Sequence, residues 1–240
     1  MKRFAVFFTF LSFALPAMAQ DYCPINVYAR KTGSLNGKWN YIIDPYETGY
    51  YNFHGLQYDQ SDPGSSSAFF NNYHAKSKQE LVEYDFDRSA SMNIPADWNT
   101  SDPKLLYYEG VVWFKRSFDY KLATGRRLFV YFGAVNYQAE VYLNGSKLSM
   151  HTGGFTGFGF EITKQLKEKG NFLVVKVDNR RKKEAVPTMN TDWWNYGGIT
   201  RDVLLVDEPE TFIEDYMVQL KPGTNNSIAG FVKINNKVAA

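Results

Sequence analysis

The sequence predicts an all-β protein built as an antiparallel β-sandwich or jelly roll. Short apolar segments are separated by turn signals roughly every ten residues, which is the spacing of strands in such folds. No segment keeps a helical apolar period for more than about two turns, so helices are predicted to be a minor component. With 240 residues and 44% apolar content, the chain is long enough to bury one substantial core.

The N-terminus has the pattern of a secretory signal peptide. Lys2 and Arg3 precede an apolar run over residues 4–15, and a small-x-small motif ends at Ala19. We therefore predict that residues 1–19 are a signal peptide cleaved near Ala19, and that the protein is exported to the periplasm or beyond the cell. The apolar run is shorter than the roughly 20 residues that a membrane span needs, and no later segment qualifies.

The charge balance excludes two classes of partner. After loss of Lys2 and Arg3, 25 basic residues face 25 acidic ones. A net charge near zero gives no electrostatic reason to expect nucleic acid or an anionic membrane as a partner. The basic run over residues 180–183 is interpreted as a solvated loop. Because Cys23 is the only cysteine, an internal disulfide is impossible and stability must come from the core.

The first third of the chain contains few strand signals. Residues 20–33 are polar and unperiodic and are predicted to be a leader. Residues 35–43 are predicted to form a strand with Trp39 and Tyr41 on one face. Residues 44–80, rich in Tyr, Asn, Ser, Gly and Asp, are predicted to be a long loop region.

The central part of the chain shows the clearest strand patterns. A short strand is predicted over residues 81–86 and a constrained loop over residues 94–98. Further strands are predicted over residues 111–118, 127–135, 138–148, 171–177 and 200–206. Asn144-Gly145 interrupts the third of these and predicts a β-hairpin turn. Residues 153–162 are predicted to be a loop entering a strand, and residues 163–170 one or two helical turns that end at a glycine.

A second domain is predicted to begin after Pro209. Residues 211–220 and 228–238 both have strand patterns, with a turn between them. Two strands alone are at best marginally stable, so we expect a further part of this domain and interpret the end at Ala240 as a truncation.

Motifs of common catalytic and metal sites do not occur in the sequence. The three histidines, His54, His74 and His151, have no metal-ligand spacing, and there is a single cysteine. The sequence has no Gly-x-Ser-x-Gly elbow, phosphate loop or Gly-x-Gly-x-x-Gly motif. We therefore predict neither a metal site nor a cofactor.

Asp192 is the carboxylate with the most distinctive surroundings. It stands beside Trp193 and Trp194 in a loop that ends at Gly197-Gly198. A carboxylate can accept hydrogen bonds from sugar hydroxyls while an aromatic ring covers an apolar sugar face. The composition leaves two interpretations open, a sugar-recognition loop and a structural loop.

Five motifs resemble, in their order along the chain, the N-terminal sugar-binding domain of glycoside hydrolase family 2. They are YYEGVVWFKRSF at 107–118, VYLNG at 141–145, HTGGF at 151–155, VKVDN at 175–179 and DWWNYGGITRDV at 192–203. Within that family the chain is most similar to the β-glucuronidase and β-galactosidase branch of secreted bacterial enzymes. The resemblance extends from about residue 33 to the C-terminus.

The resemblance implies a specific domain order. It implies a galactose-binding-like jelly-roll domain over residues 20–209 and the start of an immunoglobulin-like domain over residues 210–240. A catalytic (β/α)8 barrel with two glutamates follows in the family. That barrel alone needs roughly 250 residues, so it cannot lie within this chain and no catalytic residue is assigned here. The full enzyme is expected to act on a terminal β-linked sugar, and its assembly into a homo-oligomer is left open.

The resemblance also implies a substrate-binding role for three residues, Asp192, Trp193 and Asn195. In relatives, the acid at the position of Asp192 reaches the barrel pocket and binds hydroxyls of the terminal sugar. Gly110 departs from the β-galactosidase pattern, in which an asparagine often contacts the sugar, so a β-glucuronidase is favoured.

The predicted function is therefore the non-catalytic N-terminal part of an exo-β-glycosidase, contributing one wall of the sugar pocket. This chain alone is expected to be inactive. The alternative is a free-standing carbohydrate-binding module or lectin-like surface protein. In that case Trp193, Trp194 and Tyr196 would form the sugar platform.

Overall fold

The computed structural model describes residues 22–60, 67–77, 79–80, 82 and 84–236, and in this part the protein is all-β. Every pair of neighbouring strands is antiparallel. The one described α-helix, α1 (Trp98–Ser101), is a single turn. None of the described helices has the length and apolarity needed to cross a membrane. The predicted signal peptide, residues 1–19, lies outside the described residues.

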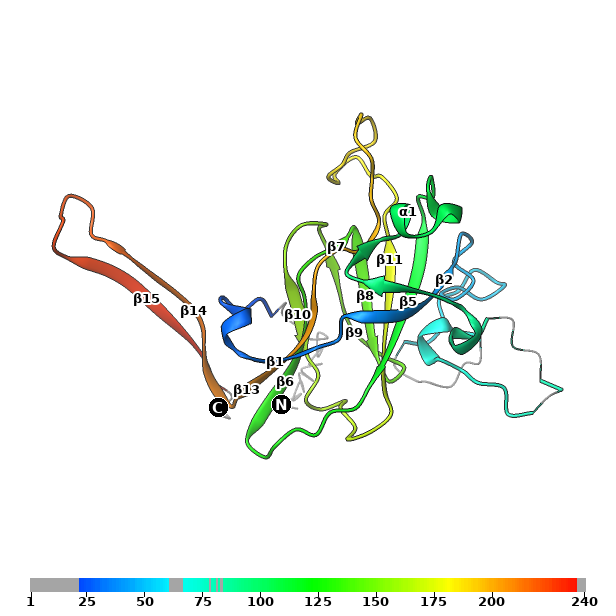
Figure 1. The fold of residues 1–240 in the computed structure, drawn as a ribbon, viewed down its shortest axis with the longest axis horizontal. Coiled ribbons are helices and arrows are strands. Elements are labelled where there is room, and N and C mark those ends of the chain that lie inside the picture. Colours follow the sequence, from blue (N-terminus) through cyan, green and yellow to red (C-terminus); the bar gives the residue numbers. More distant parts are fainter. Residues whose placement is uncertain (1–21, 61–66, 78, 81, 83, 237–240) are drawn as a thin grey trace, which may run out of the picture.

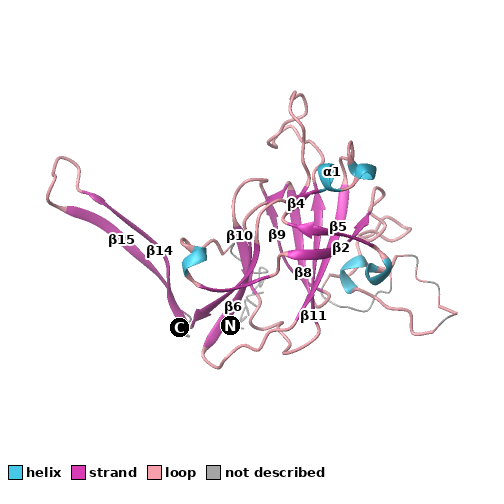
Figure 2. Ribbon diagram, viewed as in Figure 1, coloured by secondary structure: helices cyan, strands magenta, loops and turns pink. Residues whose placement is uncertain are grey.

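Two sheets form the body of the molecule (Figure 2). The larger sheet has the strand order β3 (Ala90–Ile94), β2 (Gly37–Ile43), β5 (Val111–Phe118), β11 (Asn171–Asp178), β8 (Gln138–Leu143) and β9 (Ser146–Thr152). The smaller sheet has the order β1 (Lys31–Ser34), β13 (Val203–Pro209), β6 (Arg126–Phe132) and β10 (Phe158–Glu161). Buried side chains from both sheets form one core cluster, which includes Trp39, Phe114, Val141, Val130 and Leu205. The antiparallel, mostly β architecture expected from the sequence is confirmed.

The outer face of the larger sheet is also covered. A second core cluster joins Trp113 and Tyr142 on that face to Tyr50, Phe69 and Phe70 from the segment that follows β2. The Phe70 and Tyr142 rings stack with their centres 4.7 Å apart. Consequently β5, β8 and β11 are buried on both faces along most of their length, which explains why apolar residues occupy both faces of these strands.

A small third sheet closes one end of the sandwich. It consists of β4 (Ala96–Asp97), β12 (Gly198–Ile199) and β7 (Val135–Asn136), in that order. In Figure 1 this sheet lies near α1, below the yellow-orange loop that projects at the top of the molecule. The loop that carries Asp192 therefore enters β12 at the end of the sandwich.

The C-terminal strands leave the body as a hairpin, β14 (Thr211–Leu220) and β15 (Ile228–Asn236), as predicted for these segments (Figure 1). Contacts hold the base of the hairpin to the sandwich. Phe212 is buried against Tyr22 and Phe129, and the Arg127 guanidinium donates to Asn235 Oδ1 at 2.6 Å. Residues 237 and 238, included in the predicted second strand, lie outside the described residues.

Three predictions for the first part of the chain were wrong. Residues 31–33 of the expected polar leader belong to the edge strand β1, and Tyr22 and Val27 are buried. The described part of residues 81–86 contains no strand, and a 3-10 turn begins at Phe86, because the Asp85 side chain accepts from the Asp87 amide at 2.8 Å. The expected loop at 94–98 contains β4 and the start of α1, because Asp97 caps that helix.

Two predictions for the later part were also wrong. Residues 163–170 form turns without a helix, because the Asn171 side chain bonds both the amide and the carbonyl of Lys167. The strand expected at 200–206 instead spans 203–209. Thr200 and Arg201 both donate their amides to the Ala134 carbonyl, so the chain crosses between two sheets before β13 begins.

Candidate functional site

The loop carrying Asp192 is fixed at its base by three buried asparagines. Asn179 Nδ2 donates to the Asn195 backbone carbonyl at 2.9 Å. In return, Asn195 Nδ2 donates to the Asn179 backbone carbonyl. Asn136 Nδ2 donates to Asn195 Oδ1 at 3.1 Å and to the Tyr196 carbonyl at 2.5 Å. These bonds join the end of β11 and strand β7 to the loop, so the return of the chain into β12 is set by buried amides.

Two glycines allow the loop to pass closely over α1. A Cβ on Gly197 would lie 2.1 Å from the Trp98 ring, and a Cβ on Gly198 would lie 2.6 Å from the Ala96 carbonyl oxygen. The Gly197 amide donates to Asn99 Oδ1 at 2.9 Å, and its carbonyl accepts from the Trp98 amide at 2.8 Å. The glycine pair in the sequence is therefore required by close backbone approach.

Arg181 braces the outer part of the loop. Its Nε donates to Glu109 Oε1 at 2.9 Å, and its guanidinium also reaches the carbonyl oxygens of Thr191 and Trp193, at 3.3 and 3.2 Å. One side chain thus fixes the backbone on both sides of Asp192. A guanidinium is suited to this task because its donors have a planar, fixed arrangement.

Asp192 itself is exposed and lies in a hollow of about 280 Å³. The hollow is lined by Asn99, Tyr107, Glu109, Arg181, Thr191, Asp192, Trp193, Trp194 and Asn195. Among the described residues, none forms a hydrogen bond or ion pair with the Asp192 carboxylate. The carboxylate is therefore free to accept hydrogen bonds from a ligand, on a backbone that the protein holds in place.

Exposed aromatic rings continue from this hollow. The Trp194 ring centre lies 5.4 Å from that of Tyr107 and 6.3 Å from that of Tyr196. Trp193 is 56% exposed. A wider hollow of about 600 Å³ shares Trp193 and Trp194 with the first one and is also bordered by Phe155 and Arg201. Exposed rings beside hydrogen-bonding groups can cover the apolar faces of a hydroxyl-rich ligand.

The three predicted substrate-binding residues do not occupy equivalent positions. Asp192 and Trp193 are exposed in the hollow, whereas Asn195 is buried and its side-chain amide is used within the protein. Arg181 was assigned to a solvated basic run, but it supports the loop directly. Its position three residues after Asp178, the last residue of β11, is the sequence signal that it faces the adjoining loops.

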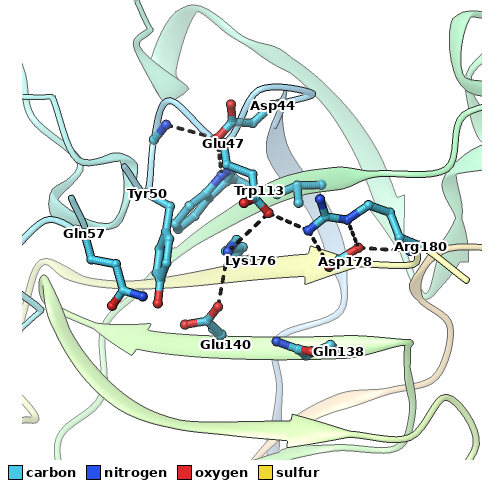
Figure 3. A network of polar contacts seen from close by, with 12 residues as sticks. Asp44, Glu47, Tyr50, Gln57, Trp113, Gln138, Glu140, Lys176, Asp178 and Arg180 are labelled. Atoms are coloured by element: carbon cyan, nitrogen blue, oxygen red, sulfur yellow. Dashed lines mark hydrogen bonds and ion pairs between the residues drawn. The ribbon is translucent and has the colours of Figure 1, made fainter. Parts of the chain in front are cut away.

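A second polar cluster, on the outer face of the larger sheet, is internally paired and mostly buried, with Arg180 at its exposed edge (Figure 3). Lys176 Nζ lies 3.2 Å from Glu140 Oε1 across β11 and β8, and 3.7 Å from the centre of the Tyr50 ring. Arg180 forms two hydrogen bonds with the Asp178 carboxylate, at 2.9 and 2.7 Å. We call Glu47, Glu140, Lys176, Asp178 and Arg180 the buried charge network. Each charged group in it forms an ion pair with another member.

The pKa of Glu140 reflects this pairing. Burial acts to raise the pKa of the carboxyl, but the charge of Lys176 and the hydrogen bond from Lys147 outweigh burial, so the pKa lies below its usual value. The carboxylate is thus held ionised as a structural group. A third group, His74 with Asp85 and Asp87, has its potential metal-ligand atoms within 4.8 Å, but the Lys115 ammonium already lies 2.6 Å from Asp87.

Comparison with known proteins identifies the domain. Residues 32–209 match the model of the sugar binding domain of glycosyl hydrolases family 2. A β-glucuronidase of Bacteroides fragilis is 34% identical over 128 residues, which are 51% of this chain and 18% of that protein. A β-galactosidase of Thermoanaerobacter pseudethanolicus is 36% identical over 116 residues, which are 45% of this chain and 15% of that protein.

Solved structures show the same relationship. A β-glucuronidase of an uncultured Clostridium species aligns with a TM-score of 0.67 and 27% identity over 90% of this chain and 35% of that one. The chain thus spans about a third of this solved enzyme and less than a fifth of the two curated relatives. The chain belongs to glycosyl hydrolase family 2, and residues 32–209 form its sugar-binding domain.

Proposed function

We propose that this chain is the N-terminal, non-catalytic part of an exo-β-glycosidase and supplies one wall of its sugar pocket. The observation that carries the proposal is the exposed, unpartnered Asp192 carboxylate on a loop that Arg181 and Asn195 hold in place. A preorganised acceptor gives more binding energy than a mobile one, because less conformational freedom is lost when the ligand binds. The two bond-breaking carboxylic acids would belong to a separate barrel domain.

A β-glucuronidase is the favoured activity, ahead of a β-galactosidase. The aligned solved structure is that of a β-glucuronidase, which supports this choice. The side chain packed against Gly110 supports it as well. A Cβ at Gly110 would lie 2.5 Å from the Tyr108 hydroxyl, which itself donates to the Val111 carbonyl at 2.9 Å. The Tyr108 ring therefore fills the space that an asparagine side chain would need in this conformation.

The remaining domain assignments are part of the same proposal. Residues 20–209 would be a galactose-binding-like jelly-roll domain, and residues 210–240 the first strands of an immunoglobulin-like domain. Residues 1–19 would direct export to the periplasm or the exterior, where a glycosidase meets extracellular sugar. The antiparallel sandwich and the projecting β14–β15 hairpin support this order.

The test measures hydrolysis of 4-nitrophenyl β-D-glucuronide and the matching galactoside. This chain alone should release no nitrophenol. In the enzyme that unites it with a barrel, Asp192→Asn should lower kcat/KM by roughly tenfold to a hundredfold, the loss expected for a charged hydrogen bond of about 1.5–3 kcal/mol.

Glu168→Gln is the matched control, because Glu168 is an exposed carboxylate on a distant turn. It should leave kcat/KM unchanged. Turnover by the chain alone, or equal rates for the Asp192→Asn variant and the wild type, would refute the proposal.

The row of exposed rings supports a second candidate function, a free-standing carbohydrate-binding module. Tyr107, Trp194 and Tyr196 form a continuous aromatic surface that could bind sugar without a barrel. Calorimetric titration of the chain with methyl β-D-glucuronide distinguishes the two. Binding that Trp194→Ala abolishes would favour the module, whereas the enzyme proposal expects the sugar to bind only when the barrel completes the pocket.

A further inference from the structure

A third hollow, of about 810 Å³, lies over the segment that covers the outer face of the larger sheet. It shares no lining residue with the hollow of Asp192. Aromatic rings dominate its described lining, among them Tyr46, Tyr51, Phe53, Tyr58 and Tyr84. We call it the aromatic hollow. Its volume lies in the range of about 300–1,000 Å³ that is usual for small-ligand sites.

The floor of the aromatic hollow is part of the core. Phe69 is buried, and its ring centre lies 5.7 Å from that of Trp113 in β5 and 5.0 Å from that of Tyr84. Gly49 leaves room for this ring, since a Cβ there would lie 2.3 Å from it. The floor is therefore a packed aromatic surface and not the tip of a loose loop.

The rim presents rings that the fold does not bury. Phe53 is 92% exposed and Tyr46 is 87% exposed. Phe53 stands in a turn ordered by Asn52, whose Oδ1 accepts the amides of His54 and Leu56 at 2.9 and 3.0 Å. Gly55 closes this turn with a φ of 72°. An ordered turn that holds a phenylalanine in solvent leaves apolar surface available to a ligand.

The polar groups of the hollow favour an uncharged ligand. The lining includes Thr48, Ser67 and tyrosine side chains, which can donate and accept hydrogen bonds. Among the described lining residues the one carboxylate is that of Glu80, which accepts from the Tyr73 hydroxyl and, at 2.7 Å, from the Lys76 amide. The hydrogen bond from Tyr73 holds the pKa of Glu80 below its usual value, so a negative charge is present. No arginine, lysine or histidine occurs among the described lining residues.

We propose that the aromatic hollow binds a neutral oligosaccharide at a site separate from Asp192. Sugar rings have apolar faces that stack on aromatic side chains and hydroxyl edges that hydrogen-bond with hydroxyl and amide groups. A polyuronate is disfavoured, because its carboxylates would face Glu80 without a cation in the described lining to balance them. The site would hold a glycan chain near the enzyme without contributing to bond cleavage.

The experiment titrates the full chain calorimetrically with cellohexaose, xylohexaose, mannohexaose and hexagalacturonate. At least one neutral hexaose should bind, and hexagalacturonate should bind at least about tenfold more weakly than that sugar. Phe53→Ala and Tyr46→Ala should each weaken the neutral sugar by about tenfold, since each removes an exposed ring. If Phe53→Ala has a lowered thermal midpoint, Phe53→Leu is used in its place, because leucine keeps apolar bulk but has no ring.

Tyr28→Ala is the matched control, because Tyr28 is also an exposed tyrosine but lines neither the aromatic hollow nor the hollow of Asp192. It should bind the neutral sugar as the wild type does. The proposal is overturned if no neutral hexaose binds at millimolar concentration or if the double variant of Phe53 and Tyr46 binds normally. It is also overturned if Tyr28→Ala weakens binding as strongly, or if hexagalacturonate binds equally well. None of these results depends on hydrolysis, so failure here is distinct from failure of the Asp192 test.

Discussion

Two regions of this domain use carboxylates in opposite ways. In the buried charge network, Glu140 is 4% exposed and Lys176 is 6% exposed, and their charged groups lie 3.2 Å apart. At the end of the sandwich, Asp192 is exposed and none of the described residues pairs with it. The comparison separates a carboxylate that the fold requires from one that the fold only positions.

The difference follows from the cost of removing charge from water. The segment after β2 covers Glu140, and a buried carboxylate without a partner would be strongly unfavourable. Lys176 stands directly opposite on β11 and supplies that partner. Asp192 is exposed to solvent, so its carboxylate needs no partner for folding. Its backbone is instead fixed by Arg181, Asn179 and Asn195.

The largest effect on stability is expected from breaking the network. Lys176→Met should lower the free energy of unfolding by about 3 kcal/mol, because Glu140 would lose its buried counter-charge and keep only Lys147, which is partly exposed. Urea unfolding followed by tryptophan fluorescence measures this loss.

The double variant Glu140→Leu with Lys176→Met is the control for that prediction. Replacing both residues also removes the buried carboxylate that has lost Lys176, so stability should recover in part. If Lys176→Met changes the free energy of unfolding by less than about 0.5 kcal/mol, the network is not a structural requirement and the contrast with Asp192 fails.

The next largest effect should come from the base of the Asp192 loop. Asn195→Ala should lower the free energy of unfolding by about 2 kcal/mol, because the Asn179 carbonyl and the Asn136 amide each lose a buried partner. Thermal unfolding detects the loss. Asn195→Ser, which restores a small polar group, should recover only a fraction, and full stability in the alanine variant would show that the asparagines do not fix the loop.

The sequence predicted correctly those features that neighbouring residues alone determine. The Asn144-Gly145 turn between β8 and β9 occurs as predicted, with Asn144 at a φ of 53° and Gly145 at 91°. The inward alternation of Ala139, Val141 and Leu143 is also confirmed. Both features depend on residues close in the chain, so they could be derived from local sequence alone.

Features that depend on distant segments could not be derived in this way. Glu140 occupies an ordinary outward position of a strand, and only its cover by the segment after β2 makes it buried. Likewise Arg181 lies in a basic run that resembles a solvated loop, and its bond to Glu109 joins residues 72 positions apart. Local patterns do not report such contacts. The resemblance to a family indicated Asp192, but it did not show that Asn195 is buried.

The acid response of the network sharpens the same contrast. Because the pKa of Glu140 is lower in the folded protein than its ordinary value of 4.5, the carboxylate contributes stability above pH 4.5 that is lost as the pH falls through the lowered value. Unfolding measured from pH 6 to pH 3 should therefore show a smaller acid loss in Glu140→Gln than in the wild type. Equal pH profiles would contradict the pairing with Lys176 and Lys147.

The smallest effect is expected at Trp193, and it decides between a sugar-recognition loop and a structural loop. The ring is more than half exposed, so Trp193→Ala should change the free energy of unfolding by less than about 0.5 kcal/mol. Trp98→Ala, at a fully buried ring beneath the same loop, should cost about 3–5 kcal/mol and shows that the assay responds to lost aromatic packing. A loss above about 1 kcal/mol in Trp193→Ala would mean that the indole packs as a structural side chain, and the loop would then lose its strongest reason to be assigned to sugar recognition.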